Sequence, residues 1–128
     1  MIRFSLTTIL LVTLLGCEPK VAAWTRSELY FGLSTRSGQA VNDDQWEQFL
    51  REVVTPRFPD GLTVVDASGQ YRDTKGTLVK EPSKILIVWR QTTAEEDRKL
   101  DDIRKVWRER FDQESVLRID QPSAGRFD

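Results

Sequence analysis

The stretch from Trp46 to Arg72 constrains the fold most, because it encodes a helix, a chain reversal and a strand in direct succession. Pro56 lacks the N–H that a further helical turn needs, so the helix ends just before it. Pro59–Gly61 predicts a tight turn, and the β-branched run that begins at Leu62 predicts a strand. The helix has one apolar face, formed at the i, i+3, i+4, i+7 and i+8 positions by Trp46, Phe49, Leu50, Val53 and Val54.

Apolar periodicity predicts three further strands. Residues 27–34 alternate between apolar and polar side chains, as a half-buried strand does, and residues 115–120 form the last strand. A hairpin turn at residues 73–76 leads into a return strand that is interrupted at Glu81–Pro82. Residues 84–90 continue this strand and are apolar on both faces, which is typical of a central strand covered on both sides. Ala67–Gly69 predicts a bulge or bend in the strand before the turn.

Both helices carry start signals. Asn42 is a good N-cap for the first helix, and Gln45 is placed to reach back to it. Thr93 and Glu96 form the same kind of capping box for a second helix, whose inward side chains are Leu100, Ile103, Trp107 and Phe111. The resulting order is β-α-β-β-α-β. We therefore predict an α+β, ferredoxin-like fold: a four-stranded antiparallel sheet with both helices on one face.

The N-terminal residues have the pattern of an export signal. An uncharged run of 13 residues, Phe4–Gly16, follows Arg3 and is too short to span a membrane. The sequence from Leu14 to Cys17 resembles the lipobox of bacterial lipoproteins, in which the signal is cut before the cysteine and the thiol is diacylated. The alternative is an ordinary signal peptide followed by a chance cysteine or a buried free thiol. The lipobox predicts a signal peptide at residues 1–16, a lipidated tether at 17–23, a domain at 24–122 and a flexible tail at 123–128.

Lipidation would place the protein at the bacterial cell envelope. Acyl chains on Cys17 would hold it on membrane lipid, because each buried methylene contributes about 0.8 kcal/mol. Glu18 stands where an Asp would indicate retention in the inner membrane, so the sequence favours the outer membrane, facing the periplasm. The six residues 18–23 span roughly 20 Å when extended, which keeps the domain close to the lipid headgroups.

Composition excludes several kinds of chemistry. The chain has no histidine, which rules out Ser-His-Asp and Cys-His devices and any His-ligated metal site. Cys17 is the single cysteine, so no intramolecular disulfide can form. With 19 basic and 20 acidic side chains, the chain lacks the basic surplus that nucleic-acid binding requires. We predict no metal, no cofactor and no nucleic-acid partner.

Several segments together resemble an uncharacterised bacterial family, the domain of unknown function 3574. They are ELYFGLS at residues 28–34, the long stretch at 52–73, EPSKILIV at 81–88 and ERFDQESVLRID at 109–120. Many members of that family are small predicted lipoproteins, in agreement with the lipobox. The resemblance implies no activity, since none is assigned to the family.

The face of the sheet opposite the helices is the expected site of any ligand chemistry. The polar candidates for that face are Tyr30, Asp66, Gln70, Arg72, Arg90 and Arg118, with Glu114 and Ser115 close to the last strand. Strand alternation puts Asp66, Gln70 and Arg72 on one side if no bulge intervenes. An aspartate among arginines and a tyrosine could bind a carboxylate or orient a small polar ligand. The alternative is an ion-pair and hydrogen-bond network on an exposed sheet face.

Three functions remain open from the sequence. The first is a lipid-anchored binding or interaction module whose open sheet face meets a partner or a second copy, as a homodimer. The second is a small cofactor-independent enzyme of the dimeric α+β barrel type that acts on a small organic substrate, with Tyr30, Asp66 or Arg90 in its active site. The third is a purely structural accessory of the envelope. Whether the protein is an enzyme is undecided at this level.

Overall fold

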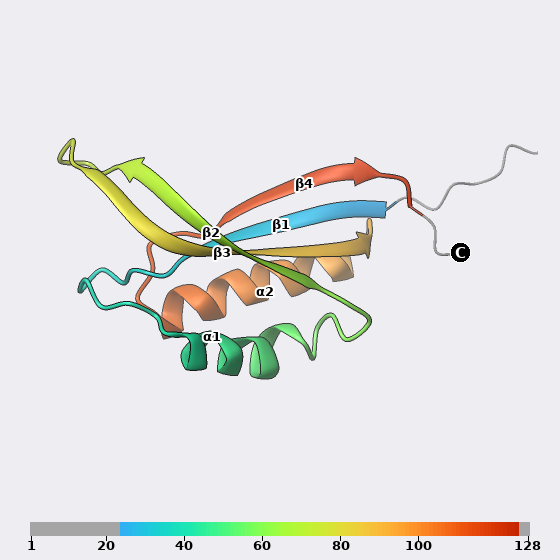
Figure 1. The fold of residues 1–128 in the computed structure, drawn as a ribbon. Coiled ribbons are helices and arrows are strands. Elements are labelled where there is room, and N and C mark those ends of the chain that lie inside the picture. The colour runs from blue at the N-terminus through green and yellow to red at the C-terminus, as the bar shows by residue number, and fades with distance from the viewer. Residues whose placement is uncertain (1–23, 126–128) are drawn as a thin grey trace, which may run out of the picture.

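The computed structural model describes residues 24–125 and has the predicted β-α-β-β-α-β order (Figure 1). The four strands form one antiparallel sheet in the order β2-β3-β1-β4, and the helices lie on one face of it. The ferredoxin-like α+β prediction is confirmed. The elements are β1 (Trp24–Gly32), α1 (Asp43–Phe49), η1 (Leu50–Val54), β2 (Thr63–Arg72), β3 (Leu78–Gln91), α2 (Ala94–Arg110) and β4 (Leu117–Ser123).

Aromatic rings fill the centre of the core between the sheet and the helices. The ring of Trp107 on α2 lies with its centroid 4.8 Å from that of Phe31 on β1 and 4.9 Å from that of Phe49 on α1. Trp46 completes the cluster at 5.5 Å from Trp107. Edge-to-face pairs of this kind add about 0.5–1.5 kcal/mol beyond their buried area. The predicted core positions of Trp46 and Trp107 are confirmed.

The first helix begins as predicted and ends differently. The Asn42 side chain accepts the N–H of Gln45, and the Gln45 side chain accepts the N–H of Asn42, which completes a capping box. The last turns widen into a π-helix, η1, where the Thr55 N–H donates to the Leu50 carbonyl at 2.8 Å. The helix still ends before Pro56, because proline has no N–H to continue it.

The β2–β3 hairpin is more regular than predicted. Its pairing register runs without a break from Thr63↔Ile87 to Arg72↔Leu78, so the bulge predicted at Ala67–Gly69 is wrong. The interruption predicted at Pro82 is also wrong. Pro82 is tolerated because β1 pairs with β3 only as far as Ser83, so no strand on that side needs its missing N–H. Beyond this point β2 and β3 continue as a two-stranded arm past the helices (Figure 1).

The ends of the domain differ slightly from expectation. β4 begins at Leu117, two residues later than predicted, and continues through Pro122 to Ser123, where an edge strand accommodates a proline. The predicted signal peptide, the tether with Cys17 and the last three residues of the predicted tail lie outside the described residues. Among the described helices, none has the length and apolar character to cross a bilayer.

Candidate functional site

The sheet face turned away from α1 and α2 carries side chains in ordered rows, and we call it the open face. Pairing registers align one side chain from each strand in a row, because paired residues lie on the same side of a sheet. Four side chains form the first row: Val65, Ile85, Tyr30 and Leu117. The next two rows contain Thr63, Ile87, Glu28 and Ile119, and then Trp89, Arg26 and Gln121.

Much of the open face is apolar and exposed. Val65 is 40% exposed, Trp89 47%, Leu117 55% and Ile119 38%, whereas the helix-facing side chains of β3, Leu86 and Val88, are at 0% and 1%. The sequence of β3 predicts a central strand covered on both sides. The central position is confirmed, but in the described residues helices cover only one side. The apolar residues of the other side therefore lie in solvent in a single chain.

A polar strip on β1 crosses this apolar surface. Arg26 Nε lies 2.7 Å from Glu28 Oε1, and the Tyr30 hydroxyl donates to Glu28 Oε2 at 2.5 Å. The Arg26 guanidinium also lies over the Trp89 ring, 5.6 Å from its centroid. The hydrogen bond to Glu28 raises the pKa of the Tyr30 hydroxyl, so this group stays protonated at neutral pH. The strip thus pairs its two opposite charges with each other, while Arg26 Nε has no aligned hydrogen-bond partner among the described residues.

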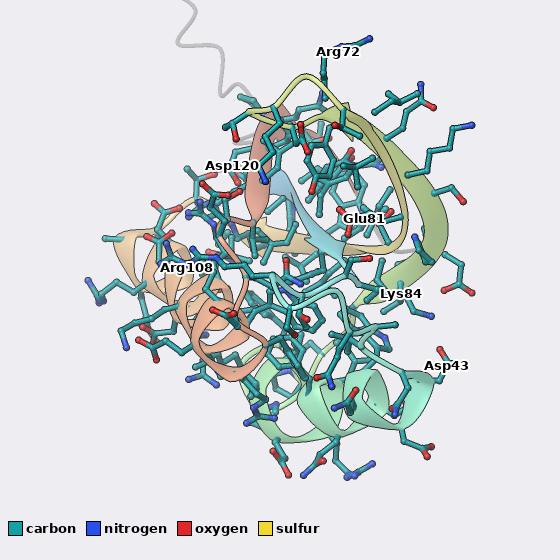
Figure 2. The ribbon with its side chains drawn as sticks, turned by 90° about the vertical axis from the view of Figure 1, so that its left-hand side faces the viewer. Asp43, Arg72, Glu81, Lys84, Arg108 and Asp120 are labelled. Atoms are coloured by element: carbon teal, nitrogen blue, oxygen red, sulfur yellow. The ribbon has the colours of Figure 1, made fainter. Side chains whose placement is uncertain are left out.

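Of the six predicted ligand residues, the structure places only Tyr30 on the open face. The other five have the opposite strand register, so their predicted placement there is wrong. Asp66 pairs with Lys84 at 2.5 Å, near Asp43 at the start of α1 (Figure 2). Gln70 and Arg72 share its side, as strand alternation predicts, but extend along the arm, where Arg72 Nη1 donates to the Gly76 carbonyl at 2.7 Å.

Arg90, another of the six, is buried between the sheet and the start of α2. Its side chain is 3% exposed, and Nη2 lies 2.9 Å from Asp97 Oδ1 and 3.3 Å from Asp120 Oδ1. Its Nε donates to Ser27 Oγ at 2.7 Å, and the Ser27 hydroxyl donates to Asp120 Oδ1 at 2.5 Å. These bonds connect β3, β1, β4 and α2 at one point.

Arg118 completes this network from β4. Its Nε lies 2.8 Å from Asp120 Oδ2 and its Nη1 3.1 Å from Asp101 Oδ1, while Nη2 pairs with Asp97. We call Ser27, Arg90, Asp97, Arg118 and Asp120 the polar clasp. The structure thus brings together two of the predicted residues, Arg90 and Arg118, in the ion-pair network that the sequence left open, but on the helix side. The clasp fastens the edge strand β4 to α2.

The clasp predicts a specific pH dependence of stability. Burial opposes ionisation of Asp120, but the hydrogen bond from Ser27 and the charge of Arg118 outweigh it and hold the Asp120 pKa below its ordinary value. A lowered folded-state pKa stabilises the fold above the unfolded-state pKa, and the contribution is lost as the pH falls. Asp120→Asn should therefore reduce the free energy of unfolding at pH 7, and the difference from wild type should narrow below about pH 4. Urea unfolding across this range measures the difference.

Asp102→Asn is the matched control, because Asp102 is exposed on α2 and lies outside the clasp. It should follow the wild-type pH curve. A gap between Asp120→Asn and wild type that stays constant down to pH 3 would show that ionisation of Asp120 does not stabilise the clasp.

A hollow of about 550 Å³ borders the open face at the β2–β3 edge. Its lining comes from the start of β1, the loop before β2, the end of β3 and the first turns of α2. Trp24, Phe58 and Trp89 supply aromatic surface, and Arg57 supplies a cation. The sequence did not identify this hollow, because its lining comes from segments that are separated in the chain and share no periodic pattern.

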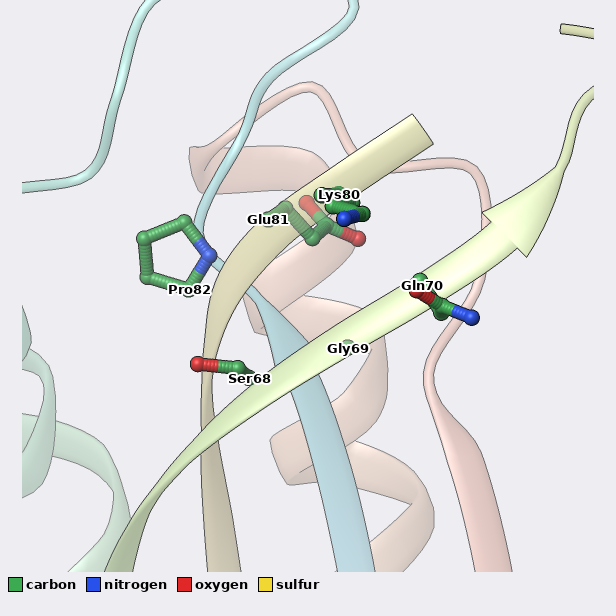
Figure 3. A pocket seen from close by; sticks show the side chains of 6 residues that line it. All are labelled: Ser68, Gly69, Gln70, Lys80, Glu81 and Pro82. Atoms are coloured by element: carbon green, nitrogen blue, oxygen red, sulfur yellow. The ribbon is translucent and has the colours of Figure 1, made fainter. Parts of the chain in front are cut away.

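A second hollow, of about 510 Å³, lies at the base of the arm (Figure 3). All six of its lining residues come from β2 and β3: Ser68, Gly69, Gln70, Lys80, Glu81 and Pro82. The Glu81 carboxylate accepts the Ser34 N–H at 3.1 Å and lies against Gly32, where any Cβ would come within 2.5 Å of it. Glu81 therefore secures the end of β1. Across the described part of the chain, no group of three or more side chains could hold a metal ion.

Comparison with solved structures identifies proteins of the same fold. A phage SAM lyase in complex with S-methyl-5′-thioadenosine has a TM-score of 0.61 and 22% identity, covering 79% of this chain and 81% of that one. The phage SAM lyase in its apo state has a TM-score of 0.61 and 21% identity, over 82% of this chain and 85% of the other. CutA from Synechococcus elongatus PCC7942 has a TM-score of 0.52 and 9% identity, over 80% and 79% of the two chains.

At these identities the likeness to solved structures establishes the fold alone. No curated protein matches the sequence. The family model described as "Protein of unknown function (DUF3574)" matches residues 26–127, which include all of the described strands and helices except the first two residues of β1. The match agrees with the resemblance found in the segments at residues 28–34, 52–73, 81–88 and 109–120. The chain therefore belongs to the DUF3574 family.

Proposed function

We propose that this protein is an interaction module of the bacterial cell envelope that pairs with a second copy of itself through the open face. The observation that carries the proposal is the composition of β3. Its residues Ile85, Ile87 and Trp89 are as apolar as the helix-facing Leu86 and Val88, yet they face no helix in the described chain. Strands that are apolar on both faces occur where both faces are covered.

The size of the open face suits a pair of small domains. Four strands about 4.8 Å apart, each with about seven residues at roughly 3.3 Å, project an area of roughly 400 Å². The accessible area of the side chains that stand on this face is larger than its projection. The projection alone is about half of the roughly 800 Å² per partner of a standard protein–protein interface, which is the size range of weak, transient contacts.

The polar strip lowers the cost of its own burial. Removing a charge from water is costly unless it is paired and hydrogen-bonded, and Glu28 both pairs with Arg26 and accepts the Tyr30 hydroxyl, although Arg26 Nε has no aligned hydrogen-bond partner among the described residues. The face also carries one positive and one negative charge side by side. A second copy turned around a twofold axis can therefore place Arg26 opposite Glu28 without bringing like charges together.

The proposal includes a lipid anchor at Cys17, on the outer membrane and facing the periplasm. What supports it is the lipobox and the small number of residues, six in the sequence, that separate Cys17 from the first residue of β1, Trp24. Anchoring confines the domain to a thin layer next to the bilayer. Confinement raises the effective concentration of one copy around another, so a modest affinity of the open face is sufficient for pairing.

Self-association can be tested with a matched pair of leucine substitutions. Leu117 on the open face and Leu78 on the arm are 55% and 49% exposed, so Asp at either position costs little in folding. In a symmetric pair each Leu117→Asp change occurs twice, burying two carboxylates, and should raise the dimer dissociation constant on the order of 100-fold. Leu78→Asp should leave it unchanged. Sedimentation equilibrium of the detergent-solubilised full chain measures both at protein concentrations up to about 1 mM, the order of effective concentration that confinement provides. A wild-type protein that stays monomeric at the highest concentration, or equal effects of the two variants, would refute the proposal.

A second candidate function is a small cofactor-independent enzyme acting on a small organic substrate. What supports it is the shared fold of the phage SAM lyase, whose structure holds S-methyl-5′-thioadenosine. Two of the three side chains considered for catalysis are poorly placed for it, because Tyr30 has a raised pKa and Asp66 is exposed and paired with Lys84. Calorimetric titration of the full chain with S-methyl-5′-thioadenosine separates the two candidates, since saturable binding favours the enzyme.

A further inference from the structure

We infer that the 550 Å³ hollow beside the open face is a binding site for a small amphipathic anion, a flat apolar molecule that carries one sulfonate, carboxylate or phosphate group. We call it the Arg57 hollow. Its volume lies within the range of about 300–1,000 Å³ that is typical of small-molecule sites. The inference concerns a site that one chain completes by itself. The hollow shares Thr63, Ile87 and Trp89 with the open face, so the site is that of the unpaired chain and does not depend on pairing.

The walls of the Arg57 hollow suit a flat apolar body. Trp24 comes from the start of β1, Phe58 from the loop after η1 and Trp89 from β3. Leu62 and Ile87 add aliphatic surface between them. Aromatic and aliphatic side chains from separate segments thus converge on one space, which is how ligand sites present their apolar lining.

The charges around the hollow select an anion. Lys99 pairs with Glu96 at 2.5 Å, and the nearby Asp60 acts on Lys99 as well, so this cation is already neutralised. Arg90 also lines the hollow but is bound within the polar clasp. Arg57 differs from both, because its guanidinium has no carboxylate within ion-pair distance among the described residues. It is the cation left for a ligand.

Arg57 is also held in a defined position. Its Nη1 donates to the Val53 carbonyl at 2.8 Å, at the end of η1. This bond uses one of the five N–H donors of a guanidinium and fixes the side chain at a helix C-terminus, where a cation is favoured. The remaining donors are available for a charged oxygen, and bonds of that kind are about twice as strong as neutral ones.

Two matched probes test the site: naphthalene-2-sulfonate, which carries the anionic group, and naphthalene-2-methanol, which lacks it. Isothermal titration calorimetry of the detergent-solubilised full chain, with a protein-free detergent blank, should show saturable binding of the sulfonate. Arg57→Gln should weaken sulfonate binding about 10- to 100-fold and leave the binding of the alcohol unchanged, because it removes only charge-assisted bonds. Trp89→Ala should weaken both probes. Arg98→Gln, at an exposed position on α2, is the control and should change neither.

Other outcomes decide against the site. Equal binding of the sulfonate to wild type and to Arg57→Gln, or no saturable binding of either probe, would overturn the inference. Arg57→Lys keeps the cation at the helix end and should retain part of the sulfonate affinity, so a loss caused only by misfolding can be recognised. Leu117→Asp, which is expected to weaken pairing on the order of 100-fold, should leave sulfonate binding intact. Failure of the pairing proposal is therefore distinguishable from failure of this one.

Discussion

Arg90→Ala is expected to destabilise the fold by about 3–5 kcal/mol, the cost of removing one partner from a buried charge network. The guanidinium of Arg90 is almost fully buried and holds two carboxylates and a hydroxyl, those of Asp97, Asp120 and Ser27. Without it, the fully buried Ser27 hydroxyl loses its donor, and the negative charge of Asp120, whose side chain is 37% exposed, loses one of its two arginine partners. Urea unfolding at pH 7, followed by tryptophan fluorescence, measures the loss.

The control for Arg90→Ala is Lys105→Ala. Lys105 pairs with Glu109 at 2.6 Å, but both side chains are largely exposed, and surface pairs of this kind contribute about 0–1 kcal/mol. A loss for Arg90→Ala as small as that for Lys105→Ala would show that the clasp is not what fastens β4 to α2. Arg90→Met distinguishes packing from charge, because it retains much of the apolar stem but not the guanidinium.

Trp107→Ala should be of similar severity, at about 3–5 kcal/mol. Trp107 is fully buried, and its ring contacts those of Phe31, Trp46, Phe49 and Phe111, which come from the sheet and from both helices. Alanine would leave a large cavity at the point where the sheet, α1 and α2 meet. Since domains of this size are stable by only about 5–15 kcal/mol, thermal unfolding should show a sharply lower midpoint.

Trp107→Phe should be far milder. Among the described side chains, the Trp107 indole nitrogen is one of two buried polar atoms without a hydrogen-bond partner. Phenylalanine removes this unsatisfied donor, and the gain offsets part of the lost volume. If Trp107→Phe proved as damaging as Trp107→Ala, the indole N–H would have a partner that this account lacks.

The local features of the fold could be predicted because they depend on neighbouring residues. The Asn42 cap, the helix end before Pro56 and the inward positions of Leu100, Ile103 and Trp107 each follow from spacing over a few residues. The effect of Pro82 on its strand could not be predicted from neighbouring residues. Its effect on β3 depends on where β1 stops pairing, which is a property of the assembled sheet.

The side of the sheet on which each polar residue lies was harder to predict. Along β3, Arg90 is two and four residues from Val88 and Leu86, so its side chain must lie on the same side of the sheet as theirs. The sequence did not decide between that side and the one with Ile85 and Ile87, because both are apolar. The prediction of Arg90 on the face opposite the helices is wrong because a buried arginine needs carboxylates from α2 and β4, which only the tertiary fold supplies.

Pairing through the open face of a lipid-anchored protein is the central claim, and cross-linking in native membranes tests it most directly. Wild type carries Cys17 alone and, with that thiol acylated, should give no dimer with a bis-maleimide. Ile87→Cys, at the centre of the open face, should give a cross-linked dimer, whereas Arg108→Cys, exposed on α2 (Figure 2), should not. A wild-type dimer would contradict the anchor, and equal yields from Ile87→Cys and Arg108→Cys would contradict pairing through this face.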